Sequence, residues 1–298
     1  MSEKAEGFGI RAGRPEDAEA VRSFTAGTFS WGDYVGEEFP AWLDEPDSRV
    51  LVAADQTDRA IAVAQVRMLS PTEAWLSGAR VHPEHRRRGI GSTMNERGMD
   101  WARQRGARVV RLATEDDNTP ARRQVEKLGY RSVARFVLAV RSFAGASGRA
   151  SIGGNGGRRV PGPERLDLAH SAEADPAYMV WSTGDQARVG HGLYPSEGWA
   201  FRRLRALDVA AAARNRQLWT CPSGWVVTEE SEDEMWVPLF ITTGEDADRA
   251  VRALVDLAGE RSARRLEVMV PRVPWLEAAL AAEQMELAHP NLIFEKAL

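Results

Sequence analysis

A stretch rich in glycine, serine and proline divides the chain near its middle. Residues 144–163 contain too many of these residues for a helix or a central strand, and they are typical of a linker or a long surface loop. The length of 298 residues also exceeds that of one ordinary compact domain. We therefore expect two domains, at residues 1–143 and 164–298, joined by a linker at 144–163.

The hydrophobic pattern of the first half alternates short strands with helices. We expect strands near Ile10 and at 49–54, 60–69, 74–82, 108–114 and 132–141, and helices at 15–27, 89–105 and 120–128. Short continuous apolar runs such as residues 61–64 indicate strands buried on both faces, which helices must then cover. The pattern predicts a layered α/β (α+β) domain.

The second half repeats this order of elements. We expect helices at 199–215, 246–259 and 274–284, and strands at 218–220, 224–228, 235–241, 265–270 and 291–296. A strand pair followed by helix, strand, helix and strand predicts a second copy of the same architecture.

Composition and charge exclude several classes of protein. The hydrophobic fraction of 43% and the charged fraction of 28% are typical of a soluble globular protein, no apolar run is long enough to span a bilayer, and we expect no secretory signal. We expect a cytoplasmic protein with no membrane partner. The formal charge of −4 divides into +1 for residues 1–143 and −5 for 144–298, so neither half has the basic excess of a nucleic-acid-binding protein. A single cysteine, Cys221, excludes an intramolecular disulfide and a cysteine metal cluster, and we expect no metal.

The segment from Ala79 to Ser92 predicts an anion-binding turn. It contains a strand, then three arginines and two glycines, then an amphipathic helix. Backbone N–H groups at a helix start point outward, glycines allow close approach of an oxygen, and arginines favour phosphate. The sequence lacks the glycine patterns of P-loop and nicotinamide-binding proteins. The remaining alternative is a solvated arginine turn that caps a helix.

Two motifs resemble signatures of the GNAT N-acetyltransferase superfamily over residues 8–141. Arg86, Gly89 and Gly91 match its Arg/Gln-x-x-Gly-x-Gly/Ala pyrophosphate-binding pattern. Asn118, Ala121 and the run Glu126–Tyr130 match a second pattern, Asn with Ala three residues later and a Glu-Lys-Leu-Gly-aromatic ending. The resemblance implies a mixed, mostly antiparallel sheet that opens between its fourth and fifth strands, with the pantetheine arm of acetyl-CoA in the gap.

The resemblance also implies roles for particular residues. Backbone groups of Val81 would pair with the pantetheine and polarise the thioester carbonyl, and loop amides would hold the pyrophosphate. Asn118 would contact the arm, although its place before Thr119-Pro120 also suits a helix cap. The predicted cofactor-binding residues are Val81, His82, Arg86, Arg87, Arg88, Gly89, Ile90, Gly91, Ser92, Asn118 and Ala121.

Direct acyl transfer to an amine needs a group that accepts a proton. Glu115 is our first candidate, and Glu73, Asp116 and Asp117 are further candidates near the ends of the same strands. Crowded carboxylates raise one another's pKa toward a useful range, although a run of acids is also typical of a solvated loop.

The usual proton donor of the resembling family is missing from this sequence. That family often has a tyrosine immediately before Glu-Lys-Leu-Gly, and this chain has Val125 there, which cannot donate a proton. Tyr130 follows the same run, and we expect it to pack in the core.

Aromatic and acidic residues follow the first helix, where the resembling fold has its substrate lid. Trp31, Tyr34 and Glu37 are the predicted acceptor-binding residues, and they suit a cationic amine. The stretch 33–43, with 75–81 and 110–114, also resembles histidine N-acetyltransferases of animals. This resemblance suggests a small amine or an amino acid as the acceptor.

The corresponding turn in the second half is acidic. Residues 242–248 contain three carboxylates that would repel a pyrophosphate, so we expect a degenerate copy that has lost acetyl-CoA binding and packs against the first domain. This arrangement resembles mycothiol synthase and related two-domain acetyltransferases. Taken together, these features predict an acetyl-CoA-dependent N-acetyltransferase. We expect it to be monomeric or homodimeric and to act by direct attack of the primary amine of a small molecule or amino acid. A non-catalytic acyl-CoA sensor and a protein N-acetyltransferase remain alternatives.

Overall fold

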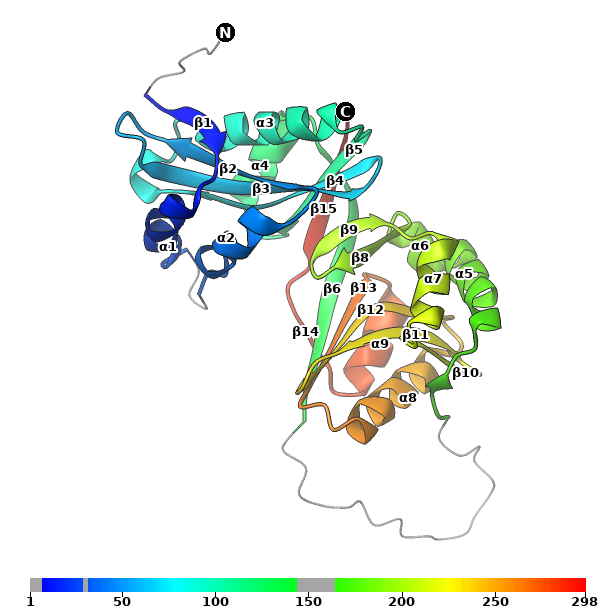
Figure 1. The fold of residues 1–298 in the computed structure, drawn as a ribbon. Coiled ribbons are helices and arrows are strands. Elements are labelled where there is room, and N and C mark those ends of the chain that lie inside the picture. Colours follow the sequence, from blue (N-terminus) through cyan, green and yellow to red (C-terminus); the bar gives the residue numbers. More distant parts are fainter. Residues whose placement is uncertain (1–6, 29–31, 144–163) are drawn as a thin grey trace, which may run out of the picture. The chain divides into compact units, whose positions relative to one another are not determined.

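The computed structural model describes residues 7–28, 32–143 and 164–298 (Figure 1). The chain forms two compact units, one of residues up to 132 together with 293–298, and one of residues 133–292. These units do not coincide with the expected ranges 1–143 and 164–298, because the strand at 131–142 passes into the second unit and the last strand belongs to the first. The expected linker at 144–163 lies outside the described residues.

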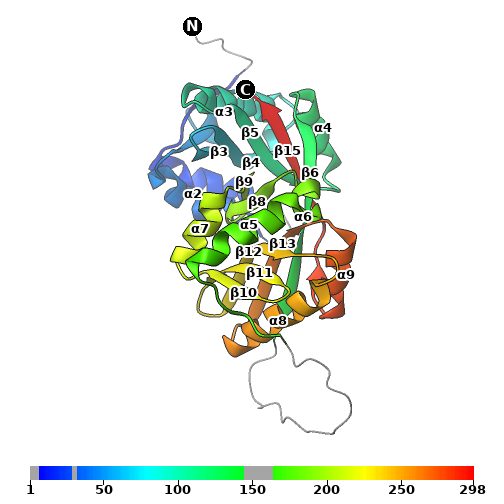
Figure 2. The ribbon, with the colours of Figure 1, turned by 90° about the vertical axis from the view of Figure 1, so that its right-hand side faces the viewer.

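The first unit is built on one mixed sheet. Its strand order is β1-β2-β3-β4-β5-β15, and Figure 2 shows β15 beside β5. The pairs from β1 to β4 are antiparallel, whereas β4 and β5 are parallel. The strands are β1 (Gly9–Ala12), β2 (Ser48–Ala54), β3 (Ala60–Ser70), β4 (Glu73–Val81), β5 (Val109–Glu115) and β15 (Asn291–Ala297).

Helices cover both faces of this sheet, as Figure 1 shows. They are α1 (Ala18–Thr25), α2 (Val35–Asp44), α3 (Ile90–Gln104) and α4 (Thr119–Lys127). Val50, Val52 and Val63 pack with α1 and α2, whereas Leu51 and Ala62 pack with α3. This alternation follows from the two-residue side-chain period of a strand.

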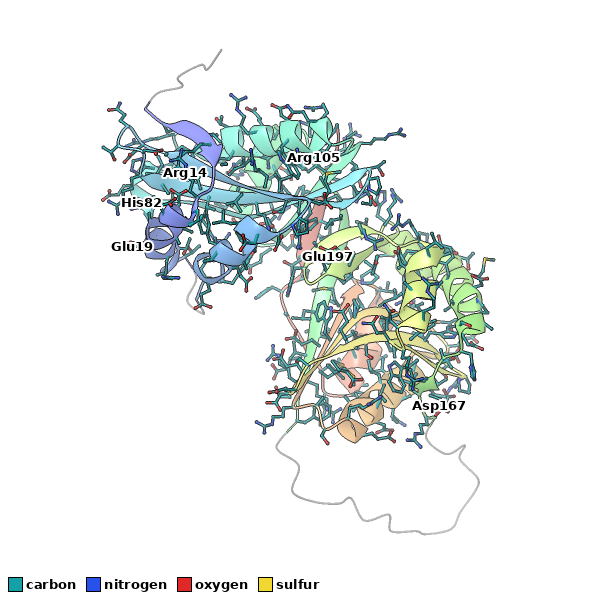
Figure 3. All side chains as sticks on the ribbon, viewed as in Figure 1. Arg14, Glu19, His82, Arg105, Asp167 and Glu197 are labelled. Carbon is teal, nitrogen blue, oxygen red and sulfur yellow. The ribbon has the colours of Figure 1, made fainter. Side chains whose placement is uncertain are left out.

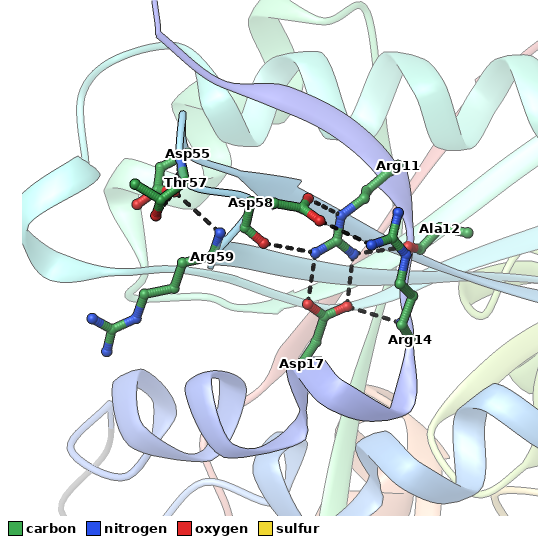
Figure 4. Close-up of polar contacts among 8 residues, drawn as sticks. All are labelled: Arg11, Ala12, Arg14, Asp17, Asp55, Thr57, Asp58 and Arg59. Carbon is green, nitrogen blue, oxygen red and sulfur yellow. Dashed lines mark hydrogen bonds and ion pairs between the residues drawn. The ribbon is translucent and has the colours of Figure 1, made fainter.

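A network around Arg11 fixes the start of this unit (Figure 4). The Arg11 guanidinium donates two hydrogen bonds of 2.7 Å to the carboxylate of Asp17, which precedes α1. Its Nε donates to Asp58 in the turn between β2 and β3 at 2.7 Å. The network therefore connects β1 to α1 and to the neighbouring hairpin.

A buried arginine joins three strands of the sheet. Arg111 in β5 is 1% exposed, and it pairs with Glu73 of β4 at 2.6 Å and with Glu295 of β15 at 2.7 Å. A buried guanidinium needs such partners, because an unpaired charge in the interior is costly. The last strand is therefore an integral part of the first unit.

The second unit has a similar mixed sheet of order β6-β13-β12-β11-β10-β7, with β14 also paired to β6. Its main strands are β6 (Arg131–Ser142), β7 (Asp167–Leu168), β10 (Leu218–Cys221), β11 (Gly224–Glu230), β12 (Glu234–Thr242), β13 (Arg265–Pro271) and β14 (Glu286–Leu287). A separate hairpin consists of β8 (Leu193–Glu197) and β9 (Ala200–Arg203). The parallel pair β12–β13 repeats the parallel pair β4–β5 of the first unit.

Helices also cover this second sheet. They are α5 (Ala174–Thr183), α6 (Asp185–Val189), α7 (Ala206–Arg214), α8 (Ala247–Glu260) and α9 (Pro274–Ala282). The expected helix at 199–215 is wrong at its start, because 200–203 form β9. The side chains of Ala200 and Phe201 are buried in that strand, and burial in a hairpin outweighs helix propensity there. The predicted layered α/β class is confirmed for both units.

Candidate functional site

The sheet of the first unit opens between β4 and β5. The two strands pair at three positions, Glu73 with Val109, Ala74 with Val110 and Trp75 with Arg111. Beyond these positions β4 continues to Val81 and β5 to Glu115 without pairing to each other. The opening lies between the fourth and fifth strands, as the sequence resemblance implies.

Val81 presents its backbone to this opening. The N–H of the next residue, His82, donates to the carbonyl of Ile61 in β3 at 2.8 Å. Because bonded and non-bonded pairs alternate along an antiparallel ladder, the N–H and carbonyl of Val81 point away from β3 and toward β5. The carbonyl accepts a hydrogen bond from Arg86 Nε at 3.1 Å, so the N–H of Val81 is the group directed at the gap.

The loop between β4 and α3 has the backbone form of an anion-binding turn. Arg87 and Gly89 both have positive φ, 64° and 77°, and Gly89 is the residue immediately before α3. A positive φ is unfavourable for arginine, and such strain is concentrated at functional sites. The side chains of Arg86, Arg87 and Arg88 are exposed, and the first amides of α3 have no partner within the helix.

The two glycines of the loop differ in their surroundings. A Cβ atom added to Gly89 meets nothing within 4 Å, so the space in front of the helix start is open. A Cβ added to Gly91 would lie 2.8 Å from Nε2 of Gln124 in α4. Gly89 therefore borders the open space directly, whereas Gly91 allows α3 and α4 to approach each other.

Three other predicted cofactor residues, Ile90, Ser92 and His82, are wholly or partly buried. The side chain of Ile90 is buried in the core under α3, so only its backbone is available to a ligand. Ser92 is half-buried in the first turn of α3. The Nδ1 atom of His82 accepts a hydrogen bond from the N–H of Glu84 at 3.3 Å, and its ring packs against Phe24 of α1. Figure 3 shows His82 on the same side of the unit as Glu19 of α1.

Asn118 caps α4. Its Oδ1 accepts a hydrogen bond from the N–H of Ala121 at 3.2 Å, which explains the spacing of these two residues in structural terms. The capping role that the following Thr119-Pro120 suggests is therefore present in the structure.

The carboxylates near the opening have different environments. Glu115 ends β5 with an exposed side chain, and its carbonyl accepts from the N–H of Asn118. Asp116 is paired with Arg122 at 3.2 Å, and Asp117 is exposed. Glu73 lies at the closed end of the β4–β5 pair in its buried ion pair with Arg111, so it is no candidate for a base at the opening.

Neither hydrophobic residue at the end of α4 supplies an available proton donor. Val125 is buried, as is Tyr130, whose hydroxyl donates to Asn95 Oδ1 at 2.9 Å. Burial raises the pKa of Tyr130 above its ordinary value, although the hydrogen bond with Asn95 acts in the other direction. Tyr130 is buried and bonded to Asn95 of α3, in agreement with the expected packing in the core.

An ion pair that the sequence did not reveal lies beside the predicted acceptor residues. The carboxylate of Asp33, which is 0% exposed, accepts hydrogen bonds of 2.5 and 3.2 Å from Arg80 in β4. Asp33 also accepts from the N–H of Val35 and so starts α2. Little in the sequence indicates this pair, because Arg80 stands out only by its place before Val81 and Asp33 only by its place before a helix.

The predicted acceptor residues lie beside this ion pair. The Tyr34 ring is 44% exposed, lies 5.8 Å from the guanidinium carbon of Arg80 and contacts Trp42. Glu37 is exposed in the first turn of α2, and Trp31 lies outside the described residues. The charge of Asp33 is paired with that of Arg80, whereas the carboxylate of Glu37 in α2 is exposed.

Comparison with known proteins identifies the family of the first unit. Residues 18–130 match the acetyltransferase (GNAT) family. The first unit contains a GNAT acetyltransferase domain. The chain as a whole has the fold of tandem GNAT proteins, and the predicted fold of two GNAT-like units is confirmed. No curated protein sequence matches this chain.

Solved structures resemble the chain over almost its full length. A GCN5-related N-acetyltransferase from Sphaerobacter thermophilus has a TM-score of 0.65 and 17% identity, with 97% of this chain and 95% of that one covered. One from Kribbella flavida has a TM-score of 0.50 and 18% identity, with 100% and 73% covered. A tandem GNAT protein from the clavulanic acid biosynthesis pathway has a TM-score of 0.53 and 13% identity, with 97% and 98% covered. At these identities the likeness shows the fold alone.

Two further observations concern the described residues only. They contain no group of three or more His, Cys, Asp or Glu side chains that could hold a metal ion. Among the same residues, no helix has the length and apolar character needed to cross a membrane.

Proposed function

We propose that the protein is an acetyl-CoA-dependent N-acetyltransferase that acts on the primary amine of a small molecule or amino acid. The observation that carries this proposal is the opening between β4 and β5, with the N–H of Val81 directed into it and the arginine loop at its end. An extended thioester cofactor with a charged diphosphate has the right shape and charge for such a site.

The loop suits the diphosphate of CoA. The exposed guanidinium groups of Arg87 and Arg88 supply positive charge, and the amides at the start of α3 supply hydrogen-bond donors. The open space in front of Gly89 leaves room for phosphate oxygens at the helix start. Asn118 and Ala121 act indirectly in this proposal, because their mutual hydrogen bond fixes the start of α4.

The opening suits the pantetheine arm and the thioester. The amine attacks the carbonyl carbon, a C–N bond forms, the C–S bond then breaks to release CoA as a thiolate, and the nitrogen loses its extra proton to water. The N–H of Val81 is placed to donate to the carbonyl oxygen, where negative charge develops during attack. This contribution comes from the backbone, so it does not depend on the side chain at position 81.

Glu115 is the proposed base. It stands at the end of β5, where that strand has separated from β4, and its exposed carboxylate can accept a proton from an ammonium group through water. The acceptor enters beside Tyr34 and Glu37, where an aromatic ring and a carboxylate favour a cation. Since Val125 cannot protonate the thiolate, we propose that the thiolate takes its proton from solvent.

A screen for acetyl transfer tests this proposal. Radiolabelled acetyl-CoA is offered with amines, amino acids, aminoglycosides and peptides, and both product and free thiol are measured. Transfer to a small amine is the expected result. Tight CoA binding without turnover on any acceptor would instead support the acyl-CoA sensor, which the missing tyrosine at position 125 favours.

A further inference from the structure

The second unit has its own opening between parallel strands. β12 and β13 pair from Glu234 with Arg265 to Val237 with Val268, and after these positions they separate. β12 then continues to Thr242 and β13 to Pro271. This geometry repeats the opening between β4 and β5.

A glutamine side chain occupies this second opening. Gln186 of α6 is 3% exposed, and its Nε2 donates to the carbonyl of Phe240 at 2.6 Å. Its Oε1 accepts a hydrogen bond of 3.2 Å from the N–H of Thr242. The carboxamide of Gln186 therefore bonds both the carbonyl of Phe240 and the N–H of Thr242, which lie on the edge of β12 that β13 leaves unpaired.

Thr242 is the counterpart of Val81. β4 and β12 are both nine residues long, and each pairs with its parallel neighbour from its first residue. Counting from that residue, Thr242 stands where Val81 stands. The N–H of Val81 faces an opening, whereas the N–H of Thr242 is already bonded to an amide.

The surroundings of Gln186 are also filled. A Cβ atom added to Gly190, just after α6, would lie 2.8 Å from the carbonyl of Gln186 and 3.3 Å from the ring of Phe136. At the turn after β12, the Trp275 ring lies about 3.5 Å from the Cβ position of Gly244, whereas the same position of Gly89 is open. The turn also carries Asp246, which accepts from Thr243 at 2.8 Å.

We propose that the second unit is a closed copy of the cofactor fold, in which Gln186 takes the place of a pantetheine amide. The carboxamide of glutamine and the amide of pantetheine are the same functional group, with one acceptor oxygen and an N–H donor. The chain therefore binds a single CoA molecule, in the first unit. This last statement rests on the proposed function, whereas the closure by Gln186 does not.

The closure is tested without any cofactor. Gln186→Leu keeps a similar size but leaves the N–H of Thr242 and the carbonyl of Phe240 buried without their partner. We expect the midpoint of thermal unfolding to fall by about 5 °C or more, since two buried backbone groups lose their hydrogen bonds. We also expect faster hydrogen exchange at the N–H of Thr242. Gln104→Leu, at an exposed position at the end of α3, is the matched control.

The number of cofactors is tested by calorimetric titration of the full chain with CoA. We expect one CoA per chain for the wild type and none for Gly89→Trp. Two molecules per chain for the wild type, with one of them lost in Gly89→Trp, would overturn the closed copy and leave the proposed function standing. If the wild type binds no CoA, both the proposed function and the count of one fail. If Gln186→Leu has the thermal stability of the wild type and the same rate of hydrogen exchange at the N–H of Thr242, then Gln186 does not close the second opening.

Discussion

Arg86 bonds back to the strand that precedes it, where its Nε donates to the carbonyl of Val81 at 3.1 Å. The bond closes the turn between β4 and α3, and it occupies the carbonyl of Val81 while leaving the N–H directed at the opening. Arg86 therefore has two tasks in the proposed site, a charge near the diphosphate and a fixed position for the backbone of β4.

Replacing Arg86 separates these two tasks. Arg86→Ala removes both the charge and the bond, and we expect the Kd for CoA to rise by about 10- to 100-fold. Arg86→Gln restores a donor for the Val81 carbonyl without the charge, so it should recover part of the loss. Calorimetry measures both, with Arg103→Ala as an exposed control in the last turn of α3. Equal affinities for Arg86→Ala and the wild type would contradict the assignment.

A side chain at Gly89 should prevent cofactor binding. Position 89 has a φ of 77° and open space around its Cβ, so Gly89→Trp places an indole where the phosphate oxygens would lie and also strains the turn. Gly198→Trp is the matched control, because Gly198 also has a positive φ of 56° and an open Cβ position. We expect undetectable CoA binding for the first variant only. Similar affinities in both would remove the basis of the loop assignment.

Glu115→Gln should affect catalysis and leave cofactor binding unchanged. Loss of a general base lowers kcat by about 10²- to 10⁴-fold, while the KM for acetyl-CoA should stay near the wild-type value. The acidic limb of the kcat/KM profile should also disappear. Asp117→Asn, two residues further along the same exposed loop, is the control. If both variants lose the same small fraction of activity, the base lies elsewhere.

Arg111 should be one of the most sensitive positions for stability. Arg111→Met leaves Glu73 in the interior without this cation, and we expect a loss of about 3–5 kcal/mol in the free energy of unfolding. The double variant Glu73→Gln/Arg111→Met should regain part of that loss, because no buried charge remains at position 73. Denaturant titration of the wild type, Arg111→Met, Glu73→Gln and the double variant measures the coupling. Additive losses would show that the two side chains act independently.

The Arg11 network predicts an acid-sensitive contribution from Asp58. The hydrogen bond and charge of Arg11 hold the pKa of Asp58 below its usual value of 3.8. A carboxyl whose pKa is lowered by folding stabilises the native state above the unfolded pKa, and this stabilisation is lost as the pH falls through the folded pKa. Asp58→Asn should therefore flatten the stability profile below about pH 4. The effect should be small, since Asp58 is exposed. The free energy of unfolding is measured against pH for the wild type and for Asp58→Asn. Parallel curves below about pH 4 would contradict this contribution of Asp58.

The helices α3 and α4, which border the proposed site, could be predicted from the sequence because the residues that start them act locally. Asn118, Thr119 and Pro120 start α4 by capping and by a proline in its first turn, and both signals are local. Gly89 marks the start of α3, because its left-handed backbone suits glycine. The helix α2 was missed, since it is short and contains Pro40, a residue that normally disfavours a helix interior.

The division of strands between the units could not be predicted from the sequence. The strands β6 and β15 were both expected at nearly their observed positions, but ladder bonds join backbone groups, so the sequence of a strand does not specify which sheet it joins. Long-range side-chain pairs carry that information, as between Arg111 and Glu295 or between Lys296 and the carbonyl of Leu128. The contacts of Gln186 with β12 are of the same kind, since more than fifty residues separate the partners.

The place of Glu295 in the first unit also sets an order for folding during synthesis. Residues 293–298 follow the whole of the second unit along the chain, so the ribosome releases them only after residues 133–292 have emerged. Until then β5 lacks one of its two neighbouring strands, and Arg111 lacks one of its two carboxylates. A nascent chain that carries every residue of the arginine loop therefore still lacks one strand of the sheet beneath it, and the acetyltransferase domain is completed only after residues 133–292 have been synthesised.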